Sequence, residues 1–271
     1  MTVATTTTTT TARGAMPAPR IPAVSADEMA EVDRLMLDDL GVEPLQLMES
    51  AGFAIADFCR QHLLAGGPTG TRILALAGTG GNGGDAMVAA RWLAGWGALP
   101  TVVLSKPASD YAGIAAHQLA TVQRMGLPIL DPAGGEEQSL PPADLILDGL
   151  LGFSAHGDPR GLVGTLIEAA NAHGAPVLAI DQPSGLDATT GAIGTPCIRA
   201  ETTLTLALPK SGLGTVHAAA VTGAIWVADI GVPTTILRRA GADLDRPLFA
   251  TDRFLEWTAE RRPRPTSSSV P

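Results

Sequence analysis

The chain has 271 residues, of which 45% are hydrophobic and 17% are charged, and its formal net charge is −9. This acidic balance argues against DNA or RNA as a partner, because proteins that bind nucleic acids present basic surfaces. No apolar run approaches the ~20 residues that a membrane span needs, and the N-terminus lacks the basic and apolar regions of a signal peptide.

Two cysteines, Cys59 and Cys197, lie far apart in the sequence. Their separation matches neither the spacing of a metal site nor a disulfide framework. We expect both to be small buried side chains, which is typical of proteins in a reducing compartment. The sequence therefore favours a cytoplasmic protein.

The two ends of the chain differ in composition from the middle. Residues 1–20 contain the run Thr5–Thr11 and two prolines, and they have too little apolar surface to fold, so we predict a disordered tail. Residues 21–260 are predicted to form one α/β domain. Residues 261–271 are rich in Pro and Ser and are predicted to form a second disordered tail.

The first ordered elements are predicted to be two helices. Ser25 and Glu28 have the spacing of a capping box, and the helix that follows them stops at Gly41. A second helix is predicted from about Pro44. We expect a homodimer, because Leu and Met side chains on these amphipathic helices are in positions that look exposed.

The most informative stretch is Thr71–Ala98. It begins with Ile73–Ala77, a short apolar run typical of a buried strand, and it closes with a helix from Ala86. Between them, five glycines in seven positions permit positive φ and let a ligand approach the backbone. The amides of such a turn, beside a helix N-terminus, suit a phosphate or another anion. Asn82 and Asp85 add side-chain oxygens at the same place.

A dinucleotide-binding dehydrogenase is one interpretation of these glycines, since G-x-G-x-x-G can be threaded through Gly78, Gly80 and Gly83. That fingerprint also needs an acidic residue about 20 positions on, at the end of the second strand. Ser105 and Lys106 stand there instead. The fingerprint is therefore incomplete.

Strand and helix patterns alternate along the rest of the chain. This alternation predicts right-handed crossovers and a mostly parallel sheet with both faces covered. Two short helical patterns are expected after Arg238. The strands are predicted at Pro100–Leu104, Asp144–Leu150, Pro176–Ile180, Thr202–Leu206 and Ala224–Ala228, and the helices at Tyr111–Met125 and Leu162–His173.

Polar residues follow the predicted strands, at the edge where open parallel sheets bind ligands. Asp148 lies in an apolar strand, so its charge must be neutralised by a hydrogen-bond network or by a cation or ligand. Asp181 ends the next strand and is either an acid/base group or the cap of a turn. Ser184 favours a turn over a nucleophile, since no G-x-S-x-G elbow surrounds it.

Two further polar residues each leave two interpretations open. His156 is a catalytic imidazole or a loop residue that shapes a substrate site. Lys210 binds phosphate or is a solvated lysine in a turn. The local pattern does not decide between these roles.

Five segments, in order along the chain, resemble the NAD(P)H-hydrate epimerase family, also called the YjeF N-terminal domain. The similarity spans roughly Ile21 to Val232, and it is far more specific than one glycine-rich loop. The segments are Leu47–Gly52 (similar to LMExAG), Gly80–Asp85 (GNNGGD), Asp148–Gly152 (DALFG), Ile180–Gly185 (DIPSG) and Pro209–Leu213 (PKxGL).

The resemblance implies a Rossmann-like three-layer α/β sandwich with a mostly parallel central sheet. It implies an isomerase that interconverts the R and S hydrates of NADH and NADPH at carbon 6 of the nicotinamide ring. Asp181 would be its acid/base catalyst, and a potassium ion would be held by Asn82, Asp148 and Ser184. The residues implied to contact the substrate are Gly81, Asn82, Gly83, Gly84, Asp85, Gly152, Phe153, Ser154, Ala155, His156, Gly157, Asp158 and Asp181.

The chain departs from the family pattern at several positions. Gly81 stands where the family usually has Asn, Ala86 where it usually has Gly, and Phe153–Asp158 replaces a TGLxG-like loop. The altered loop makes an enzyme acting on another small molecule an alternative. A non-catalytic nucleotide-binding or scaffold module is a second alternative, although a scaffold does not need the polar set that is retained. That set is Asn82, Asp148, Asp181 and Ser184.

The resemblance also implies a functional partner. Only the S hydrate is a substrate of the repair dehydratase, and no dehydratase domain follows in this sequence. An ADP- or ATP-dependent NAD(P)H-hydrate dehydratase is therefore expected as a separate chain.

Overall fold

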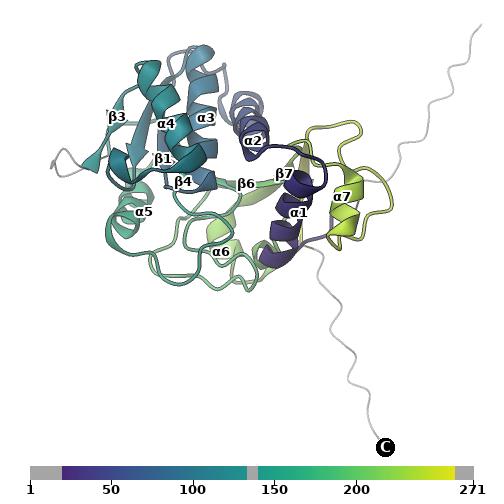
Figure 1. The fold of residues 1–271 in the computed structure, drawn as a ribbon. Helices are drawn as coiled ribbons and strands as arrows, with labels where there is room; N and C mark the ends of the chain where they lie inside the picture. The colour runs from purple at the N-terminus through teal and green to yellow at the C-terminus, as the bar shows by residue number, and fades with distance from the viewer. Residues whose placement is uncertain (1–19, 133–139, 260–271) are drawn as a thin grey trace, which may run out of the picture.

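The computed structural model describes residues 20–132 and 140–259, so the predicted tails lie outside the described residues, apart from Arg20. Its strands are β1 (Arg72–Ala77), β2 (Leu99–Leu104), β3 (Ile129–Leu130), β4 (Leu145–Gly149), β5 (Val177–Ile180), β6 (Thr202–Leu206), β7 (Ala224–Ala228) and β8 (Phe254–Trp257). They form one sheet in the order β3-β2-β1-β4-β5-β6-β7-β8 (Figure 1). Neighbouring strands run parallel except β7 and β8, which are antiparallel.

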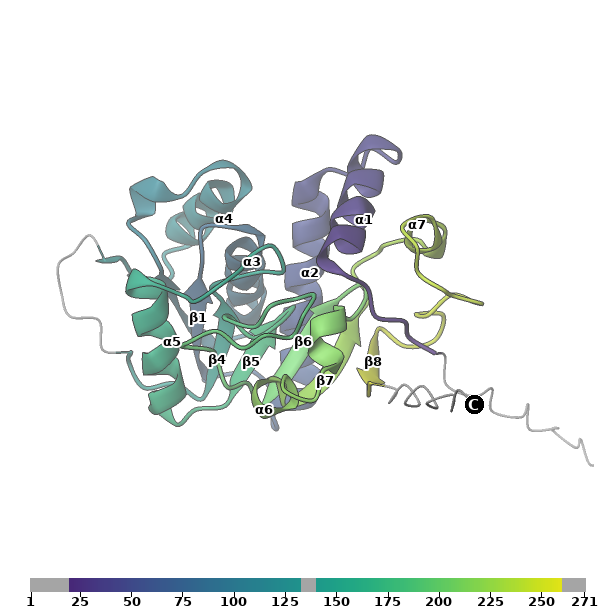
Figure 2. The same cartoon turned by 90° about the horizontal axis from the view of Figure 1, so that it is seen from below.

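Helices cover both faces of this sheet. The α-helices are α1 (Ala26–Asp38), α2 (Pro44–Phe58), α3 (Gly81–Gly95), α4 (Gly113–Arg124), α5 (Gly161–His173), α6 (Ala219–Thr222) and α7 (Thr234–Arg239). Because strand side chains alternate between faces, Ile73 and Ala75 of β1 join the core under α1–α4 while Leu74 packs with α5. Figure 2 shows the two helical layers on opposite sides of the strands. The predicted three-layer α/β sandwich is confirmed.

The segment before α1 forms backbone hydrogen bonds with the segment that follows β6. Ser25 and Glu28 form the predicted capping box. Just before it, the backbone of Val24 pairs with the segment after β6: Val24 N–H donates to Pro209 O (2.9 Å) and Ser211 N–H donates to Val24 O (2.7 Å). These bonds place the start of α1 beside the residues that follow β6.

The glycine-rich stretch differs from its prediction. We predicted a turn through Asp85 with the helix starting at Ala86, but α3 already begins at Gly81. None of the five glycines has positive φ. At three of them other groups lie too close for a side chain: a Cβ on Gly78 would lie 2.0 Å from the carbonyl oxygen of Leu150, one on Gly83 would lie 1.8 Å from that of Gly78, and one on Gly84 would lie 2.4 Å from Met48. Gly80 and Gly81 have nothing within 4 Å.

Two other expectations were wrong. The short strand β3 was not predicted, because its two residues carry little pattern of their own. The two short helices expected after Arg238 are absent from the described residues, where α7 ends at Arg239 and β8 follows. β8 forms because the free edge of β7 accepts an antiparallel partner, which a single-strand pattern does not reveal. In residues 20–132 and 140–259, no helix combines the length and apolarity needed to cross a membrane.

Candidate active site

The strand order reverses at β1, between β2 and β4. The chain goes outward from β1 to β2 and β3 and then returns to the other side of β1 to form β4. Ligands of doubly wound sheets bind beyond the carboxyl ends of the strands at such a reversal. We call the polar groups gathered there the strand-end site: Asn82, Asp85, Asp148, Asp181, Ser184 and Lys210.

Asn82, in the first turn of α3, binds the ends of two strands, β4 and β5. Its side-chain amide donates to the carbonyl oxygen of Ile180 (2.8 Å) at the end of β5 and to that of Leu151 (3.0 Å) after β4. Gly152 lies close to this side chain: a Cβ there would lie 3.0 Å from Asn82 Oδ1, so Asn82 would have to shift slightly to admit it. Within the described part of the chain, the amides of Gly81, Asn82 and Gly83 have no acceptor, and the first backbone bond back into the turn is made by Gly84.

Asp181 and Lys210 form a buried ion pair, with relative exposures of 2% and 1%. Asp181 Oδ1 accepts hydrogen bonds from Lys210 Nζ, Leu206 N–H (3.1 Å) and Thr205 Oγ1 (3.2 Å). Among the described residues no donor contacts Asp181 Oδ2. One oxygen of this carboxylate is therefore held by the protein, and the other is left for a ligand.

The backbone around this pair is strained. Asp181 has φ 67° and Ala207, close to the lysine, has φ 61°. Non-glycine residues in this region cost of order 1–3 kcal/mol and gather at functional sites. The geometry favours the acid/base interpretation of Asp181 over that of a turn cap.

Of the two interpretations of Lys210, the solvated turn lysine was wrong, because the side chain is buried. Its ammonium contacts Asp181 and Leu206 O (3.1 Å), and phosphate binding stays a prediction. The sequence could not reveal the ion pair, because the pairing depends on β6 lying beside β5.

Asp148 and Ser184 form a closed network under the site. Ser184 donates to Asp148 from its backbone N–H (2.8 Å) and from its hydroxyl (2.6 Å), and Leu150 N–H donates at 3.3 Å. Burial still raises the pKa of Asp148 to about 6, against these hydrogen bonds, which lower it. Of the two explanations offered for this charge, the hydrogen-bond network is present, and the cation stays a prediction.

The Asp181–Lys210 pair and Asp33 act on a further carboxyl group, that of Asp85. Burial and the negative charges of Asp181 and Asp33 raise the pKa of Asp85 well above its usual value, while Lys210 lowers it by less. Asp33 is an exposed residue of α1, and sequence reasoning missed it. Its position on the polar face of an amphipathic helix gave no signal, since charges there are usually solvated.

The predicted substrate loop, Gly152–Asp158, divides into two parts. Phe153 lies toward the ion pair, with its ring centroid 5.8 Å from Lys210 Nζ. His156 and Asp158 instead bind the neighbouring loop, through Asp187 (2.9 Å) and Thr195 N–H (2.9 Å). Ser154 and Gly157 are exposed, and Ala155 is half-buried. The exposed His156 is thus a loop-fixing residue here and does not contact the ion pair.

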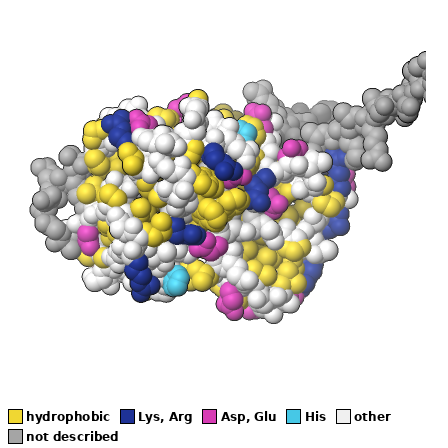
Figure 3. Space-filling model, turned by 90° about the horizontal axis from the view of Figure 1, so that it is seen from above, with side chains coloured by type: hydrophobic (Ala, Val, Ile, Leu, Met, Phe, Trp, Pro, Cys, Tyr) yellow, Lys and Arg dark blue, Asp and Glu magenta, His cyan; other side chains and the backbone are white. Residues whose placement is uncertain are grey.

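The surface offers hydrophobic and charged groups together. Figure 3 shows several hydrophobic patches on one face, with acidic and basic side chains interspersed between them. Leu37 and Leu40, in and after α1, are 40% and 48% exposed.

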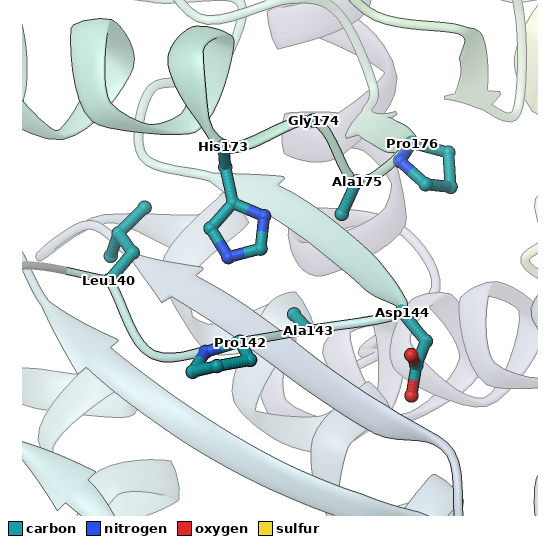
Figure 4. A pocket seen from close by; sticks show the side chains of 8 residues that line it. All are labelled: Leu140, Pro142, Ala143, Asp144, His173, Gly174, Ala175 and Pro176. Carbon is teal, nitrogen blue, oxygen red and sulfur yellow. The ribbon is translucent and has the colours of Figure 1, made fainter.

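One cavity of the described residues lies away from the strand-end site. A hollow of about 590 Å³ sits at the amino-terminal ends of β4 and β5, opposite the strand-end site (Figure 4). Among its polar groups, Asp144 pairs with Arg72 and His173 Nε2 lies 2.9 Å from Pro141 O, while the buried His173 Nδ1 has no hydrogen-bond partner among the described residues. A second cavity, of about 160 Å³, lies between the loop Gly152–Asp158 and the segment Gly185–Gly194, beside the strand-end site.

The fold and this site define a doubly wound α/β protein with a buried carboxylate–lysine pair beyond its parallel strands. Residues 44–212 match the family model described as YjeF-related protein N-terminus. This chain belongs to that family.

Named relatives extend over most of the chain. The NAD(P)H-hydrate epimerase of Dehalogenimonas lykanthroporepellens is 35% identical over 242 residues, which are 89% of this chain and 95% of the relative. The bifunctional NAD(P)H-hydrate repair enzyme Nnr of Escherichia coli is 33% identical over 88% of this chain, which spans only 44% of that enzyme. The crystal structure of the yeast protein ynu0 (YNL200c) superposes with a TM-score of 0.73 at 27% identity, covering 88% of this chain and 100% of the yeast chain.

Proposed function

We propose that this chain is an NAD(P)H-hydrate epimerase, an isomerase that interconverts the R and S hydrates of NADH and NADPH. A relative with this name matches it almost end to end. The main structural support is that the two carboxylate oxygens of Asp181 have different surroundings. Oδ1 is fixed by three donors, while Oδ2 is free to exchange a proton with the hydroxyl on carbon 6.

The remaining substrate contacts follow from the chemistry of the nucleotide. We assign its phosphates to the start of α3, where Gly81, Asn82 and Gly83 present free amides that favour anions. We assign the nicotinamide end to the side of Phe153 and Asp181, because an apolar ring and an acid/base group meet there. The half of the loop that carries His156 would shape the site indirectly.

The test is epimerisation of purified R hydrate, coupled to a dehydratase that consumes only the S hydrate, with the spontaneous rate subtracted. We expect turnover by the wild type and a loss of 10²–10⁴-fold in Asp181→Asn, the usual contribution of an acid/base group. Asp229→Asn, which changes an aspartate after β7 outside the strand-end site, is the matched control. Wild-type turnover no faster than the spontaneous rate would refute the proposal and favour another small-molecule substrate.

We further propose a potassium ion at Asn82, Asp148 and Ser184. Carboxylate, hydroxyl and amide oxygens suit a hard cation, and Asn82 Oδ1, which accepts no hydrogen bond from a described residue, faces a space that a Cβ on Gly152 would fill. A bound cation would supply positive charge at the strand ends. Isothermal titration with potassium, compared with Asp148→Asn, tests this site, and equal heats in the two proteins would contradict it.

A dehydratase that removes the S hydrate is the proposed functional partner. An epimerase alone only equilibrates two hydrates, so a second activity must consume one of them. We expect this protein and such a dehydratase together to repair a mixture of both hydrates. The dehydratase alone should repair only the S fraction. Equal repair with and without this protein would contradict it.

We also propose a homodimer in the cytoplasm. Exposed Leu37 and Leu40 and the hydrophobic patches of Figure 3 provide apolar surface that a second copy would bury. Light scattering at several concentrations tests the dimer, and a monomeric mass throughout would contradict it. Cell fractionation tests the compartment.

A further inference from the structure

Asp85 is a buried carboxyl group that the protein leaves without a hydrogen bond. Its side chain belongs to α3 and is 7% exposed. Among residues 20–132 and 140–259 no group donates to either oxygen or accepts from them. Buried polar groups are nearly always satisfied within a protein, and a structural aspartate would have such partners, as Asp148 has. An unpartnered one at this position is available to a ligand.

The charges that face Asp85 come from three other elements. Asp181 follows β5, Lys210 follows β6, and Asp33 projects from α1, and each of them acts on Asp85. The apolar side chain of Met48, from α2, packs against the adjacent Gly84. Because Lys210 is already paired to Asp181, it offsets the like charges around the buried Asp85 only in part.

Asp85 and Asp181 therefore have opposite environments within the strand-end site. Asp181 contacts an ammonium, a hydroxyl and an amide, which suits a carboxylate. Around Asp85, burial and like charges outweigh the charge of Lys210, so its pKa is raised well above its usual value and the protonated form is favoured. Two carboxyl groups whose environments differ in this way commonly divide the roles of acid and base.

We propose that Asp85 is the general acid that works with Asp181 in the epimerisation, an assignment that rests on the proposed function. Asp181 Oδ2 takes the proton of the hydroxyl on carbon 6, and the O–H electron pair becomes the second bond of a carbonyl. The bond from carbon 6 to ring nitrogen 1 breaks, and its electron pair accepts the proton of Asp85. The aldehyde turns about the bond from carbon 5 to carbon 6, and nitrogen 1 attacks its other face.

Ring closure returns both protons. The nitrogen gives its proton back to Asp85, and the new hydroxyl takes its proton from Asp181. Both carboxyl groups then stand in their starting states with the opposite epimer bound. No water, oxidant or further reactant enters the step.

The experiment compares wild type, Asp85→Asn and the control Asp57→Asn in the coupled epimerase assay across pH. Asp57 is also a buried aspartate, but it lies at the end of α2, outside the site, and pairs with Arg60 just after that helix. We expect Asp85→Asn to lower kcat 10²–10⁴-fold, with KM changed less than about threefold, because the amide keeps the shape and loses the proton. Wild-type kcat should fall in alkaline buffer as Asp85 ionises. The residual kcat of Asp85→Asn should not show this alkaline decrease.

A second measurement does not need activity. A neutral carboxyl group has its own carbonyl stretch in the infrared, and in mildly alkaline buffer the wild type should show one that Asp85→Asn lacks. Retained kcat in Asp85→Asn, a rise in KM alone, or the absence of that band would overturn the assignment while leaving the epimerase in place. A wild type without turnover would instead overturn the proposed function, and the assignment would fall with it.

Discussion

Removing the ammonium of Lys210 gives the sharpest test of the energetics of the site. Lys210→Met keeps most of the length of the side chain but leaves the carboxylate of Asp181 without its cation. Side-chain exposures of 1% for Lys210 and 3% for Asp181 place the pair in the buried class. Breaking such a pair by removing one partner costs about 3–5 kcal/mol.

For a domain of this size that loss corresponds to a fall of about 6–20 °C in Tm. Urea denaturation of the wild type and Lys210→Met gives the free energy of unfolding directly, provided that the m-values agree. The double variant Lys210→Met, Asp181→Asn should recover more than half of the loss, because it no longer buries an unpaired charge. A loss below about 1 kcal/mol, the range of exposed ion pairs, would refute the reasoning.

Two further predictions concern the glycine-rich segment and the network under the site. Gly83→Ala should lower the free energy of unfolding by about 1–3 kcal/mol, because its Cβ would overlap the carbonyl of Gly78. The control Gly80→Ala, whose Cβ would have nothing within 4 Å, should change the free energy of unfolding by less than ~0.5 kcal/mol. Equal Tm values for the two variants would contradict this prediction. Burial raises the pKa of Asp148 from 3.8 to about 6, so the native state binds that proton more tightly than the unfolded state. In potassium-free buffer, the stability of wild type relative to Asp148→Asn should therefore fall by up to about 3 kcal/mol as pH rises from about 4 to above 6, and a pH-independent difference would contradict it.

Much of the fold could be predicted because the relevant signals are local. The capping box at Ser25 and the apolar run of β1 each lie within a few residues, and the alternation of elements fixes a mostly parallel sheet. The start of α3 was predicted wrongly because a glycine can be needed either for a positive φ in a turn or for close packing in a helix. Only the approach of Gly78 to Gly83 shows that packing is the reason here.

Part of the site could also be predicted, where the signal is local in the sequence. Asp181 could be selected because it ends a strand. The partners that determine its chemistry come from other strands and helices: Lys210 follows β6 and Asp33 lies on α1. Their approach depends on strand order, which an unaligned sequence does not specify. His156 shows the converse, since a histidine in a predicted substrate loop binds Asp187 of a neighbouring loop instead.

The backbone pairing of Val24 with the segment around Lys210 bears on where this domain can be cut. The family model matches residues 44–212, yet α1 precedes that range and β7 and β8 follow it. An expression fragment trimmed to the matched residues would keep Asp181 and Lys210 but lose the strand-like contact beside the lysine, the helix that carries Asp33, and the sheet edge next to β6. The smallest unit that can work is therefore longer than the segment by which the family is recognised.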